Sequence, residues 1–483
     1  MILPSAATSI PFEVHGTGVR FVDTSNTPDN IPLITSDNAG YFTIITLGQV
    51  NFSVILDTGS SDLWVNLKNR QIFLDNSTNL QANETFGKGS LVGNIQFADL
   101  KIGDFTIQSQ AFVSATTTQD LESAHDGILG MSTNNISSIW NTIAFNFGVD
   151  AANELGNTPI PSLFLQQPNI PRNFDVALSR TDELNDIAPG VFLIGEHDQD
   201  FQQVVNAPQL PSISSAHWSV VMDAMLINGQ QFAFNASRVP GVPAGKVAAV
   251  LDTGFSLPPL PPPAVDAIYS SIPGAAFSQS LQSWIVPCNE SASISFVFGG
   301  QEYAVHPLDV TTLIVTPLNT TDGGQQNATL CINSFQYLTL DPSEFTGFDL
   351  ILGDAFLRNV YASFNYADDF QNGEGSFVQL VTTTPDANAA LNEFNTQRAA
   401  VLAKLPPQVD PAQFARQGTV ASTPSQEGSL PAQTSAGGAS GGSSTSSSTA
   451  PTGTAKHPNA AGKVGASGVA WMWGAFAVLA WVF

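Results

Sequence analysis

The sequence predicts an all-β protein built from two related halves. Residues 55–57 and 250–252 are apolar runs of the β type, and each delivers an aspartate onto a Thr-Gly turn. A second pattern, Ile-Leu-Gly, follows each turn, at residues 128–130 and 351–353. One Asp-Thr-Gly turn would be a weak signal, because strands often end in such turns for backbone reasons. Two patterns repeated in the same order indicate an internal duplication.

The four motifs together resemble the pepsin-like aspartic peptidases, in particular their fungal secreted and lipid-anchored members. The resemblance covers roughly residues 38–382. It implies a bilobal fold of two duplicated, mostly antiparallel β lobes, with a few short helices and a substrate cleft between the lobes. The expected boundaries are 1–37 for a remnant of pro-segment type, 38–195 for the first lobe and 196–382 for the second.

The charge balance narrows the possible partners. Charged residues make up 11% of the chain, and 40 acidic against 15 basic residues give a formal net charge of −25. Such a surface repels nucleic acid, so we expect no nucleic-acid partner. Crowded carboxyl groups should have raised pKa values in the folded state, which makes stability fall as pH rises. We therefore expect a protein that is most stable in acid, with a melting temperature that falls between about pH 4 and pH 7.

The cysteines and glycosylation sequons favour secretion. Only Cys288 and Cys331 are present, so neither a metal cluster nor a redox motif is expected, and no cofactor. In an oxidising compartment they would form a disulfide worth about 4 kcal/mol, and two reduced, buried thiols are the alternative. The Lys content is low, and Asn-x-Ser/Thr sequons begin at Asn51, Asn76, Asn83, Asn135, Asn235, Asn289, Asn319 and Asn327.

The first 37 residues do not follow the pattern of a secreted protein. A signal peptide begins with basic residues and an apolar core, whereas residues 1–7 are short and lack Lys and Arg. Arg20 is the only basic residue before Asp57, although pepsin-like enzymes usually carry a basic pro-segment. Either the start is incomplete or the export signal is unusual, and we favour an incomplete start.

The first half should open with a β-hairpin that leads to Asp57. Two apolar runs, 41–47 and 52–56, flank a turn expected at residues 48–51. Trp64 follows soon after. From the sequence alone it is a core residue; by the resemblance it lies beneath a flap that closes over the cleft.

Residues 83–90 form a Gly-rich turn between two strand-like runs. From the sequence this is a hairpin tip, and by the resemblance it is the flap, with Gly87 in it. The family usually has Tyr at the position of Phe86, and that hydroxyl bonds the Trp matching Trp64. Phe86 keeps the apolar lid and loses this bond, so we expect weakened activity. Lys88 either favours acidic substrate residues or is simply solvated.

Two segments carry apolar residues at helical spacing and predict helices that pack on the core. They contain Ile139, Trp140, Ile143 and Phe147 in the first half, and Val265, Ile268, Tyr269 and Ile272 in the second. Residues 190–195 predict a strand at the junction of the lobes. The proline-rich stretch 258–263 predicts a stiff extended bend, with an altered cleft shape as the alternative.

The composition changes after residue 380. Region 383–417 is expected to hold a helix, over 387–405. Residues 418–458 are rich in Ser, Thr, Gly, Ala and Pro and are expected to form a disordered stalk. The chain ends on an apolar run at 469–483, shorter than the roughly 20 residues that span a bilayer.

Small residues at 459–462 precede this run, which is the layout of a glycolipid-anchor signal spanning 459–483. We expect attachment near Asn459 or Gly462, and a membrane helix at the tail is the alternative. The expected protein is a secreted or cell-surface monomer that contacts the membrane through a lipid.

The paired aspartates suggest the chemistry. Two facing carboxylates that share one proton can activate a water and protonate a peptide carbonyl. Asp57 and Asp252 are the expected catalytic residues, and like charges so close titrate as a coupled unit. The expected supporting residues are Thr58 and Thr253, which can lock the turns together, Gly59 and Gly254, which allow close packing, and Ser60 and Ser256.

The second turn departs from the family pattern. The family has Thr or Ser where this chain has Phe255, so Asp252 loses a hydroxyl donor and its pKa should rise. Phe255 also adds bulk in or beside the cleft.

Three hypotheses follow. The first is an aspartic endopeptidase acting on proteins or peptides, with apolar cleft walls made by Trp64, Phe86, Ile128 and Phe255. The second is a catalytically weakened binding protein, because Phe86 and Phe255 both lack a hydroxyl. The third, a two-carboxylate glycosidase, is disfavoured by the duplicated Asp-Thr-Gly.

Overall fold

The structure is a computed structural model, and part of the chain is described by it. The described residues are 31–35, 40–87, 89–119, 121, 125–180, 189–319, 325–340, 346–368, 373 and 375–417. The expected anchor signal at 459–483, with Asn459 and Gly462, lies outside these residues, as do the stalk and Lys88. Of the expected remnant at 1–37, only residues 31–35 are described, and they form a strand.

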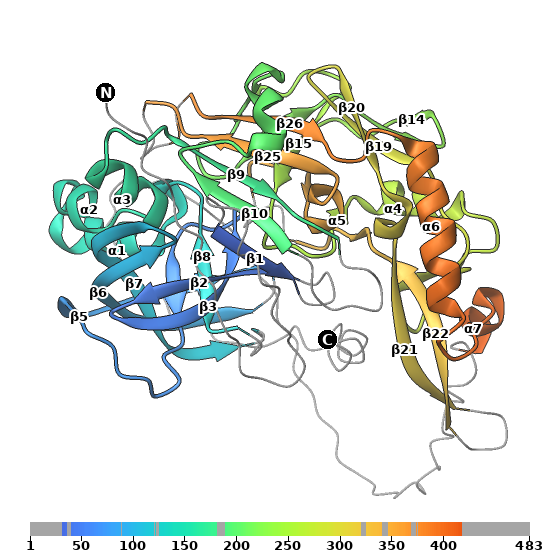
Figure 1. Ribbon diagram of the computed structural model, residues 1–483, viewed down its shortest axis with the longest axis horizontal. Coiled ribbons are helices and arrows are strands. Elements are labelled where there is room, and N and C mark those ends of the chain that lie inside the picture. Colours follow the sequence, from blue (N-terminus) through green and yellow to red (C-terminus); the bar gives the residue numbers. More distant parts are fainter. Residues whose placement is uncertain are drawn as a thin grey trace, which may run out of the picture.

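Strands dominate the described residues, which confirms the all-β prediction (Figure 1). The largest sheet has 13 strands in the order β11-β26-β25-β9-β10-β1-β2-β3-β8-β4-β7-β6-β5. Its strands are β1 (Ile31–Thr35), β2 (Tyr41–Leu47), β3 (Val50–Asp57), β4 (Leu63–Val65), β5 (Asn76–Thr85), β6 (Ser90–Ile102), β7 (Phe105–Gln119), β8 (Gly127–Gly130), β9 (Asn173–Ala177), β10 (Pro189–Ile194), β11 (Leu210–Pro211), β25 (Val360–Asn365) and β26 (Phe377–Thr382).

The second half contributes four smaller sheets among the described residues. One sheet has three strands, β12 (Ser219–Met222), β15 (Val247–Leu251) and β24 (Leu350–Leu352), and another has two, β16 (Pro259–Leu260) and β23 (Gln336–Tyr337). A third sheet has four strands, β14 (Gln230–Phe232), β13 (Ala224–Ile227), β19 (Ile294–Phe298) and β20 (Gln301–Val305). The fourth sheet also has four strands, β17 (Ala276–Ser278), β18 (Ser283–Val286), β22 (Gln325–Asn333) and β21 (Thr311–Asn319).

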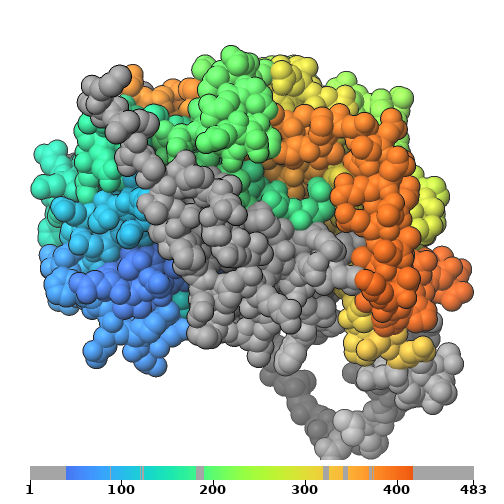
Figure 2. All heavy atoms as spheres, in the orientation of Figure 1, coloured from blue at the N-terminus to red at the C-terminus, as the bar shows by residue number. Residues whose placement is uncertain are grey.

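The helices are few and mostly short. They are α1 (Ser138–Phe147), α2 (Val149–Leu155), α3 (Pro159–Gln166), α4 (Pro262–Ser270), α5 (Asp354–Leu357), α6 (Ala387–Leu402) and α7 (Pro411–Gln417), with 3-10 turns η1 (Asn134–Ile136), η2 (Gln199–Asn206) and η3 (Pro307–Asp309). No helix of the described residues combines the length and the apolar character needed to cross a bilayer. Figure 2 shows the orange α6 and α7 at the right-hand edge, away from the blue first half.

The strand expected at 190–195 is β10, and it lies where the two halves meet. β10 pairs with β1 and with β9, and β9 pairs in turn with β25 from the end of the second half. The large sheet therefore runs from one half into the other and holds them together.

The repeated motifs lie side by side within each half. In the first half, β3 and β8 are parallel, with Leu56 opposite Leu129 and Asp57 opposite Gly130. In the second half, β15 and β24 are parallel in the same way, with Leu251 opposite Leu352. Each Ile-Leu-Gly strand thus supports the strand that carries the neighbouring aspartate, which explains why the two patterns recur together.

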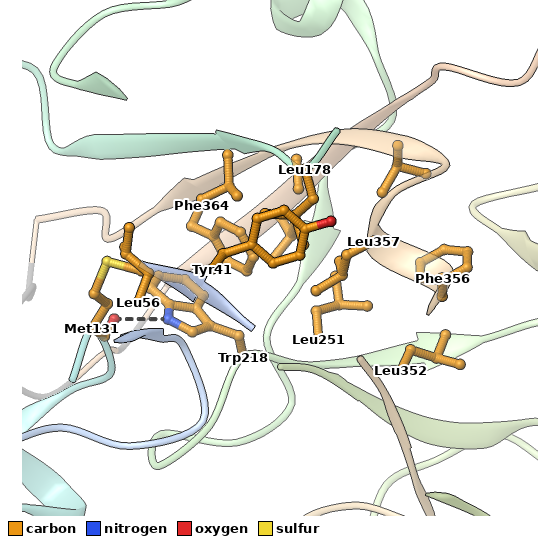
Figure 3. Close-up of a cluster of buried hydrophobic side chains, with 14 of the residues drawn as sticks. Tyr41, Leu56, Met131, Leu178, Trp218, Leu251, Leu352, Phe356, Leu357 and Phe364 are labelled. Atoms are coloured by element: carbon orange, nitrogen blue, oxygen red, sulfur yellow. Dashed lines mark hydrogen bonds between the residues drawn. The ribbon is translucent and has the colours of Figure 1, made fainter. Parts of the chain in front are cut away.

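One apolar cluster beneath the two turns draws on both halves. Figure 3 shows Leu56, Leu251 and Leu352 in this cluster, all fully buried. Trp218 lies among them, and its Nε1 donates to the Met131 carbonyl oxygen (3.0 Å). The turns therefore rest on a dry, packed base, where hydrogen bonds face little competition from water.

The first hairpin is tighter than predicted. Its turn contains only Gly48 and Gln49, which have φ values of 53° and 70°. Such a two-residue turn with both residues at positive φ matches the right-handed twist of the strands. Residues 50 and 51, expected in the turn, instead pair with Leu47 and Thr46. Valine is a good strand former, which favours this shorter turn.

The helix predicted in the first half is α1. Ser137 caps its N-terminus by accepting from the Trp140 backbone N–H, and Ile139 and Ile143 are buried as expected. The expectation that Phe147 packs on the core is wrong, because this side chain is 66% exposed at the end of the helix.

The proline-rich stretch is extended only in part. Residues 259–260 form β16, but Pro261 caps α4, and the next two prolines begin the helix. Proline is tolerated in a first helical turn, because its missing N–H would lack a partner there anyway. Val265, Ile268 and Tyr269 of α4 are buried, as predicted, and so is Ile272 just beyond it.

The predicted disulfide is present. Cys288 and Cys331 are bonded, with their Cα atoms 5.3 Å apart. The region expected to hold one helix contains both α6 and α7. Arg398 of α6 is buried and donates to the Cys288 carbonyl oxygen (3.0 Å), which fixes α6 against the bridge.

A buried carboxylate links β9 to the second half. Asp175 is fully buried and accepts from the Tyr361 hydroxyl (2.5 Å), while His197 Nδ1 lies 2.6 Å from it. The hydrogen bond with Asp175 raises the pKa of His197 above its usual value, although partial burial opposes this. The stabilisation from a charged His197 is therefore complete below about pH 6.5 and is lost as pH rises through the higher folded pKa.

We predict that His197→Gln, which keeps a donor but removes the charge, lowers the melting temperature more at about pH 5 than at about pH 8. Thermal unfolding of both proteins at the two pH values measures this. An equal difference at both would contradict a charged His197–Asp175 pair.

Candidate active site

The carboxyl groups of Asp57 and Asp252 meet where the two halves face each other. Asp57 ends β3, and Asp252 directly follows β15. Each is only 6% exposed, and each carboxyl group lies against the glycine of the opposite turn, so the two groups are close neighbours. The two turns are 195 positions apart in the sequence, and each is supported from behind by a pair of parallel strands, β3–β8 in the first half and β15–β24 in the second.

Thr58 and Thr253 join the two turns by reciprocal hydrogen bonds. The Thr58 backbone N–H donates to Thr253 Oγ1 (3.1 Å), and the Thr253 backbone N–H donates to Thr58 Oγ1 (3.0 Å). Each hydroxyl then donates to a carbonyl of the opposite half, on Leu251 (2.8 Å) and Leu56 (2.6 Å). These bonds are buried and fix the separation of the two aspartates.

The two glycines are required by close packing. The Gly59 and Gly254 N–H groups each donate to the aspartate two residues before them (2.8 Å). A Cβ at residue 59 would overlap the Asp252 carboxylate, and one at residue 254 would overlap that of Asp57. Only glycine fits at either position.

The two aspartates have different surroundings. Burial raises the pKa of Asp57, but Ser60 Oγ donates to its Oδ2 (2.5 Å) and opposes the rise. Burial raises the pKa of Asp252 further, and the charge of Asp57 adds to this. Phe255 stands where Ser60 stands in the first turn and has no hydroxyl to donate. Of the two, Asp57 is therefore the group that keeps the negative charge more easily.

The flap, residues 83–90 at the end of hairpin β5–β6, covers Trp64. The rings of Trp64 and Phe86 are tilted, with centroids 6.4 Å apart. Trp64 is 2% exposed, and its Nε1 has no hydrogen-bond partner among the described residues. A buried donor left without a partner costs about 1–3 kcal/mol.

The flap tip also reaches the second half. A Cβ added to Gly87 would lie 2.5 Å from Phe255 Cζ, so the ring lies directly against this glycine. Phe255 also packs beside Val250, Phe348 and Ile351 of the second half. The side chain therefore spans the space between the flap and the second half.

The remaining predicted site residues lie in different settings. Ile128 is 8% exposed and packs in the same cluster as Trp64, while Ser256 is half-buried. Seven of the sequon asparagines are exposed: Asn51, Asn76, Asn83, Asn135, Asn235, Asn289 and Asn327. The side chain of the eighth, Asn319, is not described.

Three further carboxyl groups near the pair were not predicted from the sequence. Asp354, which follows the second Ile-Leu-Gly, is fully buried, and neither of its carboxyl oxygens has a hydrogen-bond partner among the described residues. Burial raises its pKa well above the usual value. Its position directly after the second Ile-Leu-Gly was the available signal, although Met131 follows the first. Asp62 and Glu84 form a second close pair beside the flap, for which the sequence offered no pattern.

Metal ligands do not cluster in the part of the chain that the structure describes: no three His, Cys, Asp or Glu side chains gather there.

Comparisons with known proteins show which family this chain is similar to. The family model for eukaryotic aspartyl protease matches residues 40–371. The chain is 29% identical over 350 residues to a probable vacuolar protease A of Arthroderma benhamiae, covering 68% of this chain and 76% of that protein. It is 27% identical over 366 residues to pepsin-3 of Oryctolagus cuniculus, covering 71% and 83%.

Among solved structures, the aspartic proteinase from Irpex lacteus is similar, with a TM-score of 0.54 and 19% identity. The match covers 73% of this chain and 98% of that one. At this identity the likeness concerns the fold, and it agrees with the two-halved β architecture.

We predict that Phe86→Tyr provides an acceptor for Trp64 Nε1 and stabilises the closed flap by about 1 kcal/mol. The expected result is an increase in kcat/KM of about fivefold toward a peptide substrate, with a higher melting temperature. Phe86→Leu is the control, because it keeps an apolar lid without the hydroxyl. A Tyr variant no better than the Leu variant would contradict this account.

Proposed function

The chain belongs to the eukaryotic aspartyl protease family and is an aspartic-type endopeptidase, and on this premise we propose that Asp57 and Asp252 hydrolyse peptide bonds at acidic pH. The observation that carries the proposal is that two nearly buried carboxyl groups are held beside each other by the threonines and glycines of the two turns. Family membership makes the glycosidase hypothesis wrong.

The difference between the two turns assigns a role to each aspartate. Asp57, with the Ser60 and Gly59 donors, acts as the carboxylate that takes a proton from the attacking water. Asp252, whose pKa is raised by burial and by the charge of Asp57, donates its proton to the peptide carbonyl oxygen. After attack, the carbon is tetrahedral. Asp57 then passes the proton that it took from water to the leaving nitrogen. The C–N bond breaks as a carbonyl re-forms, and the hydroxyl proton of the tetrahedral carbon returns to Asp252.

The surroundings of the pair favour apolar substrate residues. Trp64, Ile128 and the ring of Phe86 form one apolar group on the first half, and Phe255 faces them from the second. Burying a large apolar side chain is worth roughly 1.5–3 kcal/mol, which suffices to select hydrophobic residues around the cleaved bond.

The weakened binding protein remains the second candidate. It is motivated by the partnerless Trp64 Nε1 and by the missing hydroxyl at Phe255. We favour the enzyme, because both changes affect residues around the pair, whereas both aspartates and the threonines that join them are retained.

An acidic location fits this chemistry. Relatives from Arthroderma benhamiae and Candida albicans are named as vacuolar proteases. The exposed sequon asparagines and the disulfide support passage through an oxidising, glycosylating compartment. We propose an extracellular or vacuolar glycoprotein that acts as a monomer, with a lipid anchor added near Asn459 or Gly462.

We predict pepstatin-sensitive cleavage of denatured globin near about pH 3.5, after removal of any pro-segment. Asp57→Asn and Asp252→Asn should each reduce kcat by about 10³-fold or more, because each removes one proton-transfer partner. Asp150→Asn, on the exposed helix α2, is the control for a change of charge. Absence of cleavage by the wild-type protein from about pH 2.5 to pH 6 would favour the binding protein.

We also predict that Phe255→Ser changes both specificity and pH dependence. The smaller side chain opens space beside Gly87, so bulkier substrate residues should be accepted at one position of the cleavage profile. Its hydroxyl can donate to Asp252, which lowers the pKa of that carboxyl and moves the alkaline limb of the rate profile to lower pH. Mass-spectrometric profiling of a peptide library measures the first effect. An unchanged profile would mean that Phe255 does not line the cleft.

A further inference from the structure

A second carboxyl pair lies at the base of the flap, and the peptidase chemistry described above does not use it. Its first member is Asp62, five residues after Asp57 and only 3% exposed. The Asp62 carboxylate accepts from the backbone N–H groups of Ser138 (2.7 Å) and Ile139 (3.1 Å), at the start of α1. It also accepts from Ser137 Oγ (2.5 Å). Asp62 therefore ties the turn that carries Asp57 to α1.

The second member is Glu84, on β5 of the flap hairpin. Its Oε1 accepts from Ser138 Oγ (3.0 Å), and Ser138 Oγ also lies 2.9 Å from Asp62 Oδ2. The Ser138 hydroxyl therefore lies between the Glu84 and Asp62 carboxyl groups, and the charge of Asp62 acts on Glu84. Phe86 and Gly87 follow Glu84 within three residues, so this contact fixes the strand directly before the flap tip.

The surroundings determine which carboxyl holds the proton. Burial raises the pKa of Asp62, but hydrogen bonds from Ser137, Ser138 and Ile139 oppose this rise and favour its charged form. Glu84 has only one such donor, while burial and the charge of Asp62 raise its pKa well above the usual value. In acid, Glu84 is therefore the neutral partner, and its O–H can donate to Asp62.

We propose that Glu84 is a positioning residue for catalysis: one proton shared with Asp62 clamps the flap strand onto α1 and the Asp57 turn, and loss of that proton releases the flap. This inference rests on the proposed function for its effect on rate. When Glu84 ionises, its charge faces that of the buried Asp62, and no proton remains to hold the two carboxyl groups together. The flap then loses its attachment close to Phe86, and the closed cleft is less populated.

Few other charges act on this pair. Besides Asp62, the charge of Asp57 also raises the pKa of Glu84. Helix α1 and strand β7 carry no charged side chain. On β6, the neighbour of Glu84 is Leu91, while Asp99 and Lys101 lie at the other end of the strand. Lys88 lies outside the described residues.

The sign of the effect follows from the raised pKa of Glu84. The closed flap binds a proton that the released flap holds less tightly, so the closed form is favoured in acid and weakens as pH rises through the pKa of Glu84. The clamp thus restricts activity to acidic pH separately from the titration of Asp57 and Asp252.

The test compares Glu84→Gln with Glu84→Ala. The amide of the Glu84→Gln variant can donate to Asp62 at every pH and cannot ionise, so the alkaline limb of kcat/KM should move up by about one pH unit or more, with acid activity retained. The Ala variant should lose about tenfold in kcat/KM at acidic pH, because the clamp is gone. Glu154→Gln on exposed α2 makes the same charge change and should leave the profile unchanged.

Hydrogen exchange provides a readout that does not depend on activity. After correction for intrinsic rates, protection of β5 and β6 should fall between about pH 4.5 and pH 7 in the wild-type protein and stay constant in Glu84→Gln. If the wild-type protein cleaves nothing, the proposed function fails and exchange alone decides on the clamp. Superimposable rate profiles or equal exchange in the wild-type and Glu84→Gln proteins would overturn the proposal.

Discussion

The reciprocal hydrogen bonds between Thr58 and Thr253 are the constraint on which the site depends. Both residues are at most 1% exposed, so water cannot replace a lost bond, and a donor left without a partner costs about 1–3 kcal/mol. This rigidity holds two carboxyl groups together although their mutual repulsion and burial oppose it. The hydroxyls bond carbonyls of opposite halves, so any movement of one half relative to the other strains the pair.

The two Asp-Thr-Gly turns would be equivalent if the same residue followed each of them. Because different residues follow, Asp57 and Asp252 differ in how readily they lose a proton. Ser60 donates to Asp57, while Phe255 gives Asp252 no such bond and instead extends to Gly87 of the flap. The presence of Phe255 instead of a hydroxyl residue therefore bears on both the acid strength of Asp252 and the shape of the proposed cleft. Glu84 and Asp62 repeat the principle at the flap: two carboxyls share a site, and their unequal donors determine where the proton resides.

Much of the fold and of the candidate site was predictable from the sequence, because the repeated motifs indicate both how the strands pack and which chemistry the site performs. The two Asp-Thr-Gly turns predicted the meeting of Asp57 and Asp252, and the replacement of Tyr by Phe86 predicted the absence of a partner for Trp64 Nε1. Contacts between distant segments without a repeated pattern were not predictable. Glu84 meets Asp62 only because β5 packs on α1, and Phe147 ends exposed because its helix finishes beyond the core.

The central claim is that one proton lies between two adjoining carboxyl groups. A crystal structure of the active protein at acidic pH measures their separation directly. We expect the facing oxygens of Asp57 and Asp252 to lie within about 3.5 Å, or to be bridged by a single water. Oxygens more than about 4 Å apart with no bridging water would contradict the account.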